Sequence, residues 1–236
     1  TVYGGVGRTW DLALMNPLTS YRLLATQDSE RWNNNSFVAA DCSASLGGLV
    51  NLRGQMLFDD FLLEDEIQDR WALNLGADIC RLPLPGANTL RLEYERVSSF
   101  AYNTFQSWER YLVSGRPLGA ELGNDYRRVT VALTQYFTPD FDITGRVSYT
   151  GRGAHRVTSP ISGLLNSASL RFPTKTVEES LEVMLSLRWQ ALGWCNIKAS
   201  GGLLDQSGLN NVAGSNRQRG FATVVLCLYH DLLMKF

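Results

Sequence analysis

The sequence has no long apolar run, since no stretch approaches the ~18 consecutive apolar residues that a membrane-spanning helix requires. This absence excludes a helical membrane protein, although a transmembrane β-barrel shows no such run either. The chain also has no dominant charge, because 22 Lys and Arg residues nearly balance 23 Asp and Glu residues. A net charge of −1 gives no electrostatic footprint for nucleic acid and no polybasic patch for a membrane surface. We therefore expect no nucleic-acid partner.

Histidine is scarce, and the motifs of common enzymes are missing. The two histidines are His155 and His230, and there is no G-x-S-x-G motif to carry a nucleophilic serine. His155 lies beside Arg152 and Arg156, and His230 falls on the apolar side of the last predicted strand, so neither suits a general base. The glycines of Gly4–Gly7 follow no parallel-sheet strand and open no helix, which argues against a phosphate loop. We expect no enzyme activity, no catalytic residue and no cofactor.

The four cysteines are spread along the chain and form no C-x-x-C pair, so a redox motif or a cysteine metal site is not expected. By alternation Cys42 and Cys195 share the apolar faces of their predicted strands, whereas Cys80 and Cys227 share the polar faces. We expect the cysteines to act as small buried hydrophobic residues. One disulfide between them is still possible if the protein faces an oxidising compartment. The acidic run Asp59–Asp69 lacks the spaced ligands and the glycine of a calcium loop, so we expect a solvated loop and no metal.

Period-two alternation, in contrast, is abundant. In the closing stretch Gly220–Phe236, apolar side chains recur at every second position up to Phe236, which indicates a strand between two different environments. A last strand that stays apolar to its end is typical of an outer-membrane barrel, where it meets lipid, but it also fits the last strand of a soluble sandwich. Thr1 opens without a signal peptide, so we expect a mature, processed or truncated chain.

Similar alternation recurs along the rest of the chain, with hairpin signals at Gly47-Gly48 and at Thr138-Pro139-Asp140. Long polar loops are predicted at Ser114–Asp125, Arg152–Val177 and Asp205–Arg219. The predicted strands before the closing stretch are Phe37–Leu46, Leu49–Phe58, Trp71–Cys80, Thr89–Ser99, Arg127–Phe137, Phe141–Gly151, Leu181–Gln190 and Trp194–Leu204.

The length and charge of these strands favour a membrane barrel. We predict about ten strands of ~9–12 residues joined alternately by short turns and long loops, whereas strands of soluble sandwiches have ~5–6 residues. The polar faces carry ionisable groups in mid-strand, such as Arg91 with Glu93 and Asp142 with Arg146. In a small soluble core such charges would be costly, but across a wet lumen they can pair and stay hydrated. The sequence therefore predicts an all-β, antiparallel transmembrane β-barrel.

Four segments resemble the Wzi family of capsule-assembly outer-membrane proteins. They are WDLALMNP at Trp10–Pro17, FDDF at Phe58–Phe61, LEYERV at Leu92–Val97 and GRPLGAELGND at Gly115–Asp125. The last is the most specific, because family members carry a similar Pro-Leu-Gly…Leu-Gly-Pro-Asp segment, in which Asn124 of this chain replaces the second proline. In family terms the resemblance covers the C-terminal half, since family barrels have about eighteen strands.

The resemblance implies a lectin-like, non-enzymatic barrel of the Gram-negative outer membrane that binds, attaches or exports capsular polysaccharide or exopolysaccharide. Its implied partners are outer-membrane lipid, lipopolysaccharide and surface polysaccharide. Residues 1–236 then form a single barrel domain or the C-terminal part of one. An isolated half-barrel has two open edges, which lipid does not tolerate, so a missing half, another chain that completes the barrel, and closure of about ten strands all stay open. A structural subunit of a larger envelope assembly and a porin-like channel are the alternative functions.

The candidate polysaccharide-binding residues lie in or near the Ser114–Asp125 loop. They are Trp108, Tyr111, Arg116, Glu121, Asn124 and Asp125. Aromatic faces stack on sugar rings, while Arg, Asn and carboxylate groups bind hydroxyls and acidic sugars. The alternative for the aromatic residues is a girdle at the membrane interface, and the alternative for Arg116–Asp125 is a structural loop fixed by its glycines and Pro117.

Overall fold

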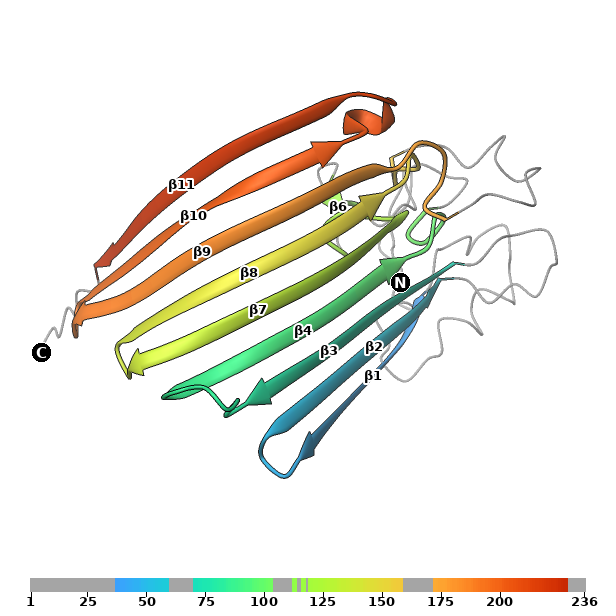
Figure 1. Ribbon diagram of the computed structural model, residues 1–236. Coiled ribbons are helices and arrows are strands. Elements are labelled where there is room, and N and C mark those ends of the chain that lie inside the picture. The colour runs from blue at the N-terminus through green and yellow to red at the C-terminus, as the bar shows by residue number, and fades with distance from the viewer. Residues whose placement is uncertain are drawn as a thin grey trace, which may run out of the picture.

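The computed structural model describes residues 37–59, 70–103, 112–113, 116–117, 119–158 and 172–228, and nine long strands of this part form one antiparallel sheet (Figure 1). They are β1 (Phe37–Leu46), β2 (Val50–Asp59), β3 (Trp71–Cys80), β4 (Ala87–Val97), β7 (Tyr126–Thr138), β8 (Phe141–Arg152), β9 (Glu178–Leu192), β10 (Cys195–Ser207) and β11 (Asn216–Leu228). A small hairpin of β5 (Leu112–Val113) and β6 (Arg116–Pro117) and the 3-10 turn η3 (Leu209–Asn211) are the other described elements. The predicted all-β, antiparallel fold class is confirmed.

Each long strand pairs with its neighbours in chain order, so the sheet is a series of hairpins. Short turns join the strands at one end of the sheet, the turn end, and longer segments join them at the other, the loop end (Figure 1). At the turn end Gly47 and Gly48 have φ angles of 58° and 66°, which glycine adopts without steric cost and which connect β1 to β2 as predicted. No helix among the described residues is both long enough and apolar enough to cross a membrane.

The predicted Asp205–Arg219 loop is wrong in extent. β10 continues to Ser207 and β11 begins at Asn216, and Gln206 pairs with Arg217 across these two strands. At the loop end the β10–β11 hairpin extends beyond the apolar part of the sheet. Its polar residues are therefore still paired as strands. The closing strand is described only to Leu228, and the rest of the Gly220–Phe236 stretch lies outside the described residues.

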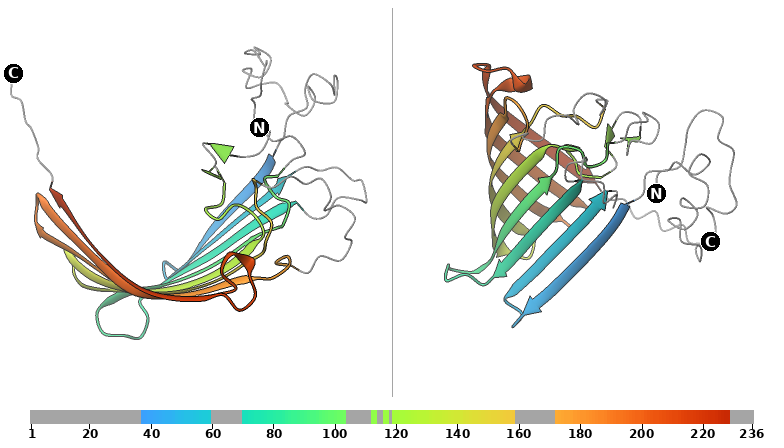
Figure 2. Two further views of the ribbon diagram at one scale, coloured as in Figure 1. Left: turned by 90° about the horizontal axis from the view of Figure 1, so that it is seen from above. Right: turned by 90° about the vertical axis from the view of Figure 1, so that its right-hand side faces the viewer.

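The sheet is curved like a trough, with a concave inner face and a convex outer face (Figure 2). The strand registers place Thr130 and Ser148 on the inner face, and Val131 and Val147 on the outer face. Exposed large apolar side chains on the outer face are Val38, Leu46, Leu52, Leu75, Leu92, Val129, Val131, Leu133, Val147, Leu181, Val183, Leu185, Trp189, Leu203, Val224 and Leu226. The predicted division into an apolar and a polar face is therefore confirmed.

Charged side chains are nearly confined to the inner face. Within the nine long strands, the registers direct only Arg96, Arg127, Glu179 and Asp205 to the outer face, and all four lie near the loop end. An apolar outer face with charges only near one end is the pattern of a surface that meets lipid.

The cysteines lie on the predicted faces but are not buried as expected. Cys42 is exposed, and Cys80, Cys195 and Cys227 are half-exposed, because none of the described elements forms a second layer over these strands. All four are free thiols, so the disulfide that the sequence left open is not formed.

The two edge strands of the described sheet run in the same direction. Nine strands alternate in direction from β1 to β11, so both edges run from the loop end to the turn end. Joining β1 to β11 within one chain, or around a two-fold axis along the trough between two copies, would create parallel seams. Closure by antiparallel pairing alone requires an odd number of further strands between these edges.

Candidate functional site

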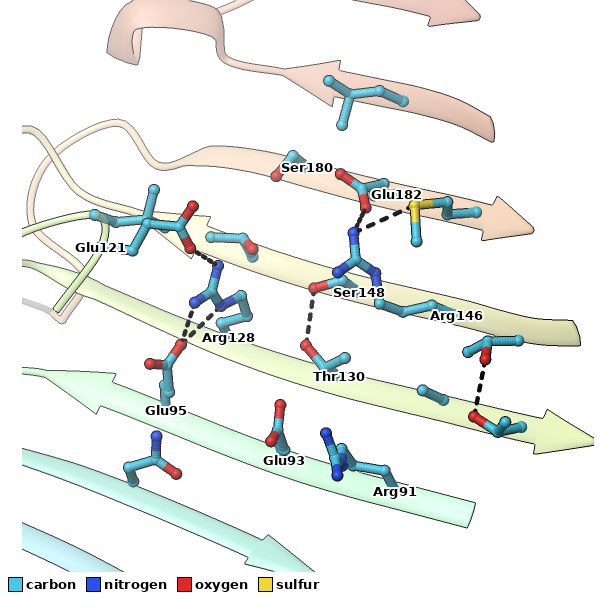
Figure 3. A pocket seen from close by; sticks show the side chains of 18 of the residues that line it. Arg91, Glu93, Glu95, Glu121, Arg128, Thr130, Arg146, Ser148, Ser180 and Glu182 are labelled. Atoms are coloured by element: carbon cyan, nitrogen blue, oxygen red, sulfur yellow. Dashed lines mark hydrogen bonds and ion pairs between the residues drawn. The ribbon is translucent and has the colours of Figure 1, made fainter. Parts of the chain in front are cut away.

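The inner face of the sheet contains a polar hollow of about 850 Å³ (Figure 3). Its lining comes mainly from β4, β7, β8 and β9, whose inward positions carry arginine, glutamate, serine and threonine in place of apolar residues. Because successive residues of a strand point to opposite faces, the polar positions of each strand become one continuous wall. Labelled side chains in Figure 3 point into this hollow from four neighbouring strands and one loop.

Ion pairs join the inward-facing charged side chains of the hollow and of the adjoining strands β2 and β3. They are Arg53 with Asp78 and Glu93, Arg91 with Asp78, Arg128 with Glu95 and Glu121, Arg146 with Glu182, and Arg188 with Asp142. Hydroxyl pairs lie between them, with Oγ1 of Thr130 3.1 Å from Oγ of Ser148. Most of these charges stay partly exposed, so each pair adds at most ~1 kcal/mol to stability. Their main consequence is a dense array of donors and acceptors facing the hollow.

A loop from the loop end folds onto the inner face (Figure 2), and its residues Glu121 and Leu122 line the hollow. Gly119, Ala120 and Glu121 line a second, smaller hollow together with Gln55 and Tyr102. A Cβ atom on Gly119 would lie 2.6 Å from the Tyr102 ring, so only glycine allows this close contact. This loop therefore covers part of the inner face beside the hollow.

A small core holds the loops of this end in place. Its buried members are Ala72, Val97, Ala101, Tyr102, Tyr126 and Val157, none more than 8% exposed. The outer apolar face has no comparable cover, so the stable packing of the described chain is concentrated at the loop end. The loop that covers this part of the inner face is thus part of the folded structure.

The carboxylate of Asp125 is the centre of the hydrogen bonding at the loop end. It is fully buried and accepts hydrogen bonds from Oγ of Ser99 at 3.0 Å, from the backbone N–H of His155 at 3.0 Å, and from the backbone N–H and the hydroxyl of Thr174. Its backbone C=O accepts a bond from the N–H of Gly153. Three chain segments that are distant in sequence are therefore joined through one side chain.

His155 is buried beside this centre without a hydrogen-bond partner for its ring. The ring lies 5.3 Å from the Phe100 ring, and neither of its nitrogens has a partner among the described residues. Burial lowers the pKa of His155 from its ordinary value of 6.5, and the positive charges of Lys175 and Arg156 add to this effect, while Asp125 opposes it. The folded state therefore favours the neutral imidazole.

We expect the loop end to lose stability in acid because of His155. The unfolded state binds the proton near pH 6.5, whereas the folded state resists it, so stability falls as the pH drops below about 6.5 towards the lowered folded-state pKa. Hydrogen exchange of the loop-end amides at pH 7.5 and pH 5 measures this loss. His155→Phe keeps the stacking on Phe100 and should remove this contribution, so an unchanged pH dependence in that variant would exclude His155 as its origin.

The sequence-predicted binding residues are not gathered at one surface. Trp108 and Tyr111 lie outside the described residues, as does His230. Arg116 is exposed on the small β5–β6 hairpin, and Glu121 is exposed at the mouth of the hollow, where it pairs with Arg128. The remaining two, Asn124 and Asp125, point into the protein interior.

Asn124 and Asp125 are fully buried, which favours the structural alternative for this part of the loop. The side-chain amide of Asn124 donates to the backbone C=O of Ser99 at 2.6 Å. Both residues therefore fix the loop that carries Glu121, and their burial keeps them from a sugar, although Oδ1 of Asn124 has no hydrogen-bond partner among the described residues. The acidic run is described only at Asp59, which is buried and accepts a bond from the backbone N–H of Tyr102.

Arg128 is the residue of the hollow that sequence reasoning missed. It lies between Glu95, at 2.6 Å, and Glu121, at 2.9 Å, and so joins the strand wall to the covering loop (Figure 3). The Arg127-Arg128 doublet conceals it, since one arginine points outward and the other inward. Counting alternate positions back from the Thr138-Pro139-Asp140 turn would have assigned Arg128 to the polar face.

A family model described as capsule assembly protein Wzi matches residues 1–219 of the chain. No curated protein and no solved structure matches it significantly.

Proposed function

Because the chain belongs to the capsule assembly protein Wzi family, as the resemblance of its motifs indicated, we propose that it is an outer-membrane barrel protein that binds surface polysaccharide without chemical turnover. The observation that carries this proposal is the combination of a bare apolar outer face and an ion-paired polar hollow on the inner face. A soluble function would leave the outer face exposed to water.

The distribution of aromatic residues supports insertion in a membrane. On the outer face Trp71 and Tyr149 lie near the loop end, and Phe141 and Trp189 lie near the turn end. Phe141 and Tyr149 are separated along β8 by about 26 Å at ~3.3 Å per residue, or about 20 Å in height for a strand tilted by ~40°. This is close to the ~25 Å apolar band between the aromatic girdles of outer-membrane barrels.

The inner hollow supports binding of a hydroxyl-rich or charged glycan. Arginine and carboxylate pairs that remain partly hydrated can exchange water for sugar hydroxyls, since both partners keep free donor or acceptor positions. Of the predicted contacts, Glu121 and Arg116 stay in the proposal, together with Arg128 and Glu95 of the wall. We place the contact surface at the loop end, where the covering loop lines part of the hollow.

The absence of turnover is part of the proposal. Ser99, Asp125 and His155 meet at the loop end, but Ser99 donates directly to Asp125, and the His155 ring makes no hydrogen bond with either. A serine nucleophile needs a histidine base within hydrogen-bond reach, which this arrangement does not provide. The described residues also contain no group of three His, Cys, Asp or Glu that could hold a metal ion.

The barrel itself requires further strands, and we propose that additional polypeptide supplies them. Open edges in hydrocarbon leave backbone groups without partners at a cost of several kcal/mol each. The parallel direction of β1 and β11 favours completion by an odd number of strands over direct joining of β1 to β11. The structural-subunit alternative shares this requirement and differs only in having no glycan ligand.

Polysaccharide binding should depend on Arg128. In the detergent-solubilised protein, Arg128→Gln is expected to weaken binding of surface polysaccharide from the source strain about tenfold, the loss of one charge-assisted bond worth ~1.5 kcal/mol. Titration of tryptophan fluorescence measures this affinity. Arg188→Gln is the matched control, because Arg188 is also inward-facing and ion-paired but lies near the turn end. Equal affinities of both variants and the wild type would contradict the loop-end location, and no binding by the wild type would favour the structural subunit.

A further inference from the structure

Two arginines of the edge strand β11 face the inside of the trough near the loop end. Arg217 lies opposite Gln206 of β10, and Arg219 lies opposite Leu204. Gln206 and Leu204 both line the polar hollow, so the two arginines share its side of the sheet. Both arginines are exposed. Because they are two positions apart on one face of a strand, two like charges lie side by side, about 7 Å apart along the strand.

The inward-facing arginines of the strands from β2 to β9 all have acceptors on adjacent elements. Five of them form an ion pair with a carboxylate on a neighbouring strand, and these are Arg53, Arg91, Arg128, Arg146 and Arg188. The sixth, Arg152, donates to the backbone C=O of Leu122 at 2.8 Å. Cross-strand pairing with a carboxylate is therefore the usual arrangement for an arginine on this face.

The arginines of β11 have no such acceptor. Neither Arg217 nor Arg219 forms an ion pair or a side-chain hydrogen bond with a described residue. The neighbouring strand β10 cannot supply a carboxylate, because its single acidic residue, Asp205, points to the outer face. Its inward Lys198 adds a further positive charge. On its other side β11 is the edge of the described sheet, so the missing acceptors coincide with a missing neighbour (Figure 1).

The opposite edge shows the same feature with the reverse sign. Asp41 of β1 lies opposite Gln55, which lines the second hollow, so Asp41 also faces inward. It is exposed and forms no ion pair with a described residue. Inward charges without a partner thus gather at both edges of the sheet, cationic beside β11 and anionic beside β1.

A strand paired with β11 is the kind of partner that meets both needs of this edge. In hydrocarbon the free backbone N–H and C=O groups of an edge require partners, which an antiparallel strand supplies. The same strand directs every second side chain to the inner face, where directly opposite residues have Cβ atoms ~4.5–5.5 Å apart. Carboxylates at these positions can pair with arginines of β11 as Glu95 pairs with Arg128. A glycan in the hollow would leave the backbone of the edge without partners.

We propose that β11 binds an antiparallel strand of further polypeptide that carries carboxylates facing Arg217 and Arg219. This inference rests on the closed barrel of the proposed function, but not on polysaccharide binding. The added strand runs from the turn end to the loop end, because β11 runs the other way. Its carboxylates lie in its loop-end half, at the level of the two arginines.

Reversing the two charges tests the chemistry of the partner. In outer membranes of the source strain, Arg217→Glu/Arg219→Glu is expected to yield at least about fivefold less closed barrel than the wild type, because carboxylates then oppose carboxylates. The closed barrel is measured by the change in its electrophoretic migration on boiling. Arg217→Lys/Arg219→Lys keeps both charges and should close as the wild type does. Gln206→Glu is the matched control, because it places a carboxylate at the same level on β10.

Zero-length cross-linking identifies the partner strand. Carbodiimide joins an amine to a carboxylate in contact with it, so the Arg219→Lys variant should become linked to an aspartate or glutamate of the added strand, which mass spectrometry locates. A link within one chain assigns the strand to the same polypeptide, and a link between chains assigns it to a separate one. Either supports the inference. A link to Asp41 would instead show direct pairing of the two edges and would overturn it.

Other results contradict the inference in distinguishable ways. Closure of Arg217→Glu/Arg219→Glu to the extent of the wild type, or no cross-link from Arg219→Lys, would exclude an acidic strand. If closure were unchanged but binding of polysaccharide fell about tenfold, the two arginines would belong to the glycan site. A wild type whose migration does not change on boiling would overturn the closed barrel itself, on which the inference rests.

Discussion

Replacing Asp125 with alanine is expected to unfold the loop end and to lower the free energy of unfolding by about 3–4 kcal/mol. The carboxylate accepts hydrogen bonds from three residues, Ser99, His155 and Thr174, which come from separate segments. Because Asp125 is fully buried, water cannot replace it without opening the packing around it. Urea unfolding in detergent, followed by tryptophan fluorescence, measures the change, and limited proteolysis shows whether cleavage appears first in the loops.

One further variant separates the charge of Asp125 from its shape, and a second serves as its control. Asp125→Asn keeps the size of the side chain but turns one acceptor oxygen into a donor that faces other donors, so we expect most of the loss to persist. Asp140→Asn is the matched control, because Asp140 is exposed in the turn between β7 and β8. A loss of under 1 kcal/mol for Asp125→Ala would show that the loops are held by their apolar core alone.

The strands could be predicted because the two faces of the sheet meet different environments. In Trp71–Cys80 large apolar residues alternate with small or polar ones, and β3 has these bounds. Glycine and proline mark the short turns, since Gly47 and Gly48 supply the left-handed backbone that the β1–β2 hairpin needs. Beyond the apolar band, in Asp205–Arg219, both faces of the sheet carry polar residues. The same reasoning therefore predicted a loop where β10 and β11 are still paired.

The site was harder to predict, because exposure and partners depend on contacts between distant segments. Asn124 and Asp125 have the chemistry of sugar ligands, and only the approach of Ser99 and Thr174 shows that both side chains are buried and hydrogen-bonded within the protein. Composition cannot distinguish a carboxylate that binds a ligand from one that holds the fold together. Arg128, in contrast, had a periodicity signal, which the neighbouring Arg127 obscured.

An arginine placed in the middle of the outer face should weaken the protein in a membrane far more than one placed beside it on the inner face. Leu185 of β9 is 60% exposed on the outer face, and Gly145 and Gly201 lie opposite it on the neighbouring strands. In lipid, Leu185→Arg is expected to cost ~2–4 kcal/mol, as arginine does at the bilayer midplane of outer-membrane barrels. Ser186 points to the polar inner face, so Ser186→Arg should change the free energy of unfolding by less than ~1 kcal/mol.

The sign of this comparison decides which face meets lipid. Urea titration of both variants in phospholipid vesicles, with fluorescence of nearby Trp189 as a signal, gives the two free energies of unfolding. If the outer face were in water, Leu185→Arg would replace an exposed leucine and change stability by no more than ~0.5 kcal/mol. A larger loss for Ser186→Arg than for Leu185→Arg would reverse the faces and contradict the barrel. The expected order would instead establish the outer face as the lipid-facing surface, because only hydrocarbon penalises a charge on a side chain that the protein leaves uncovered.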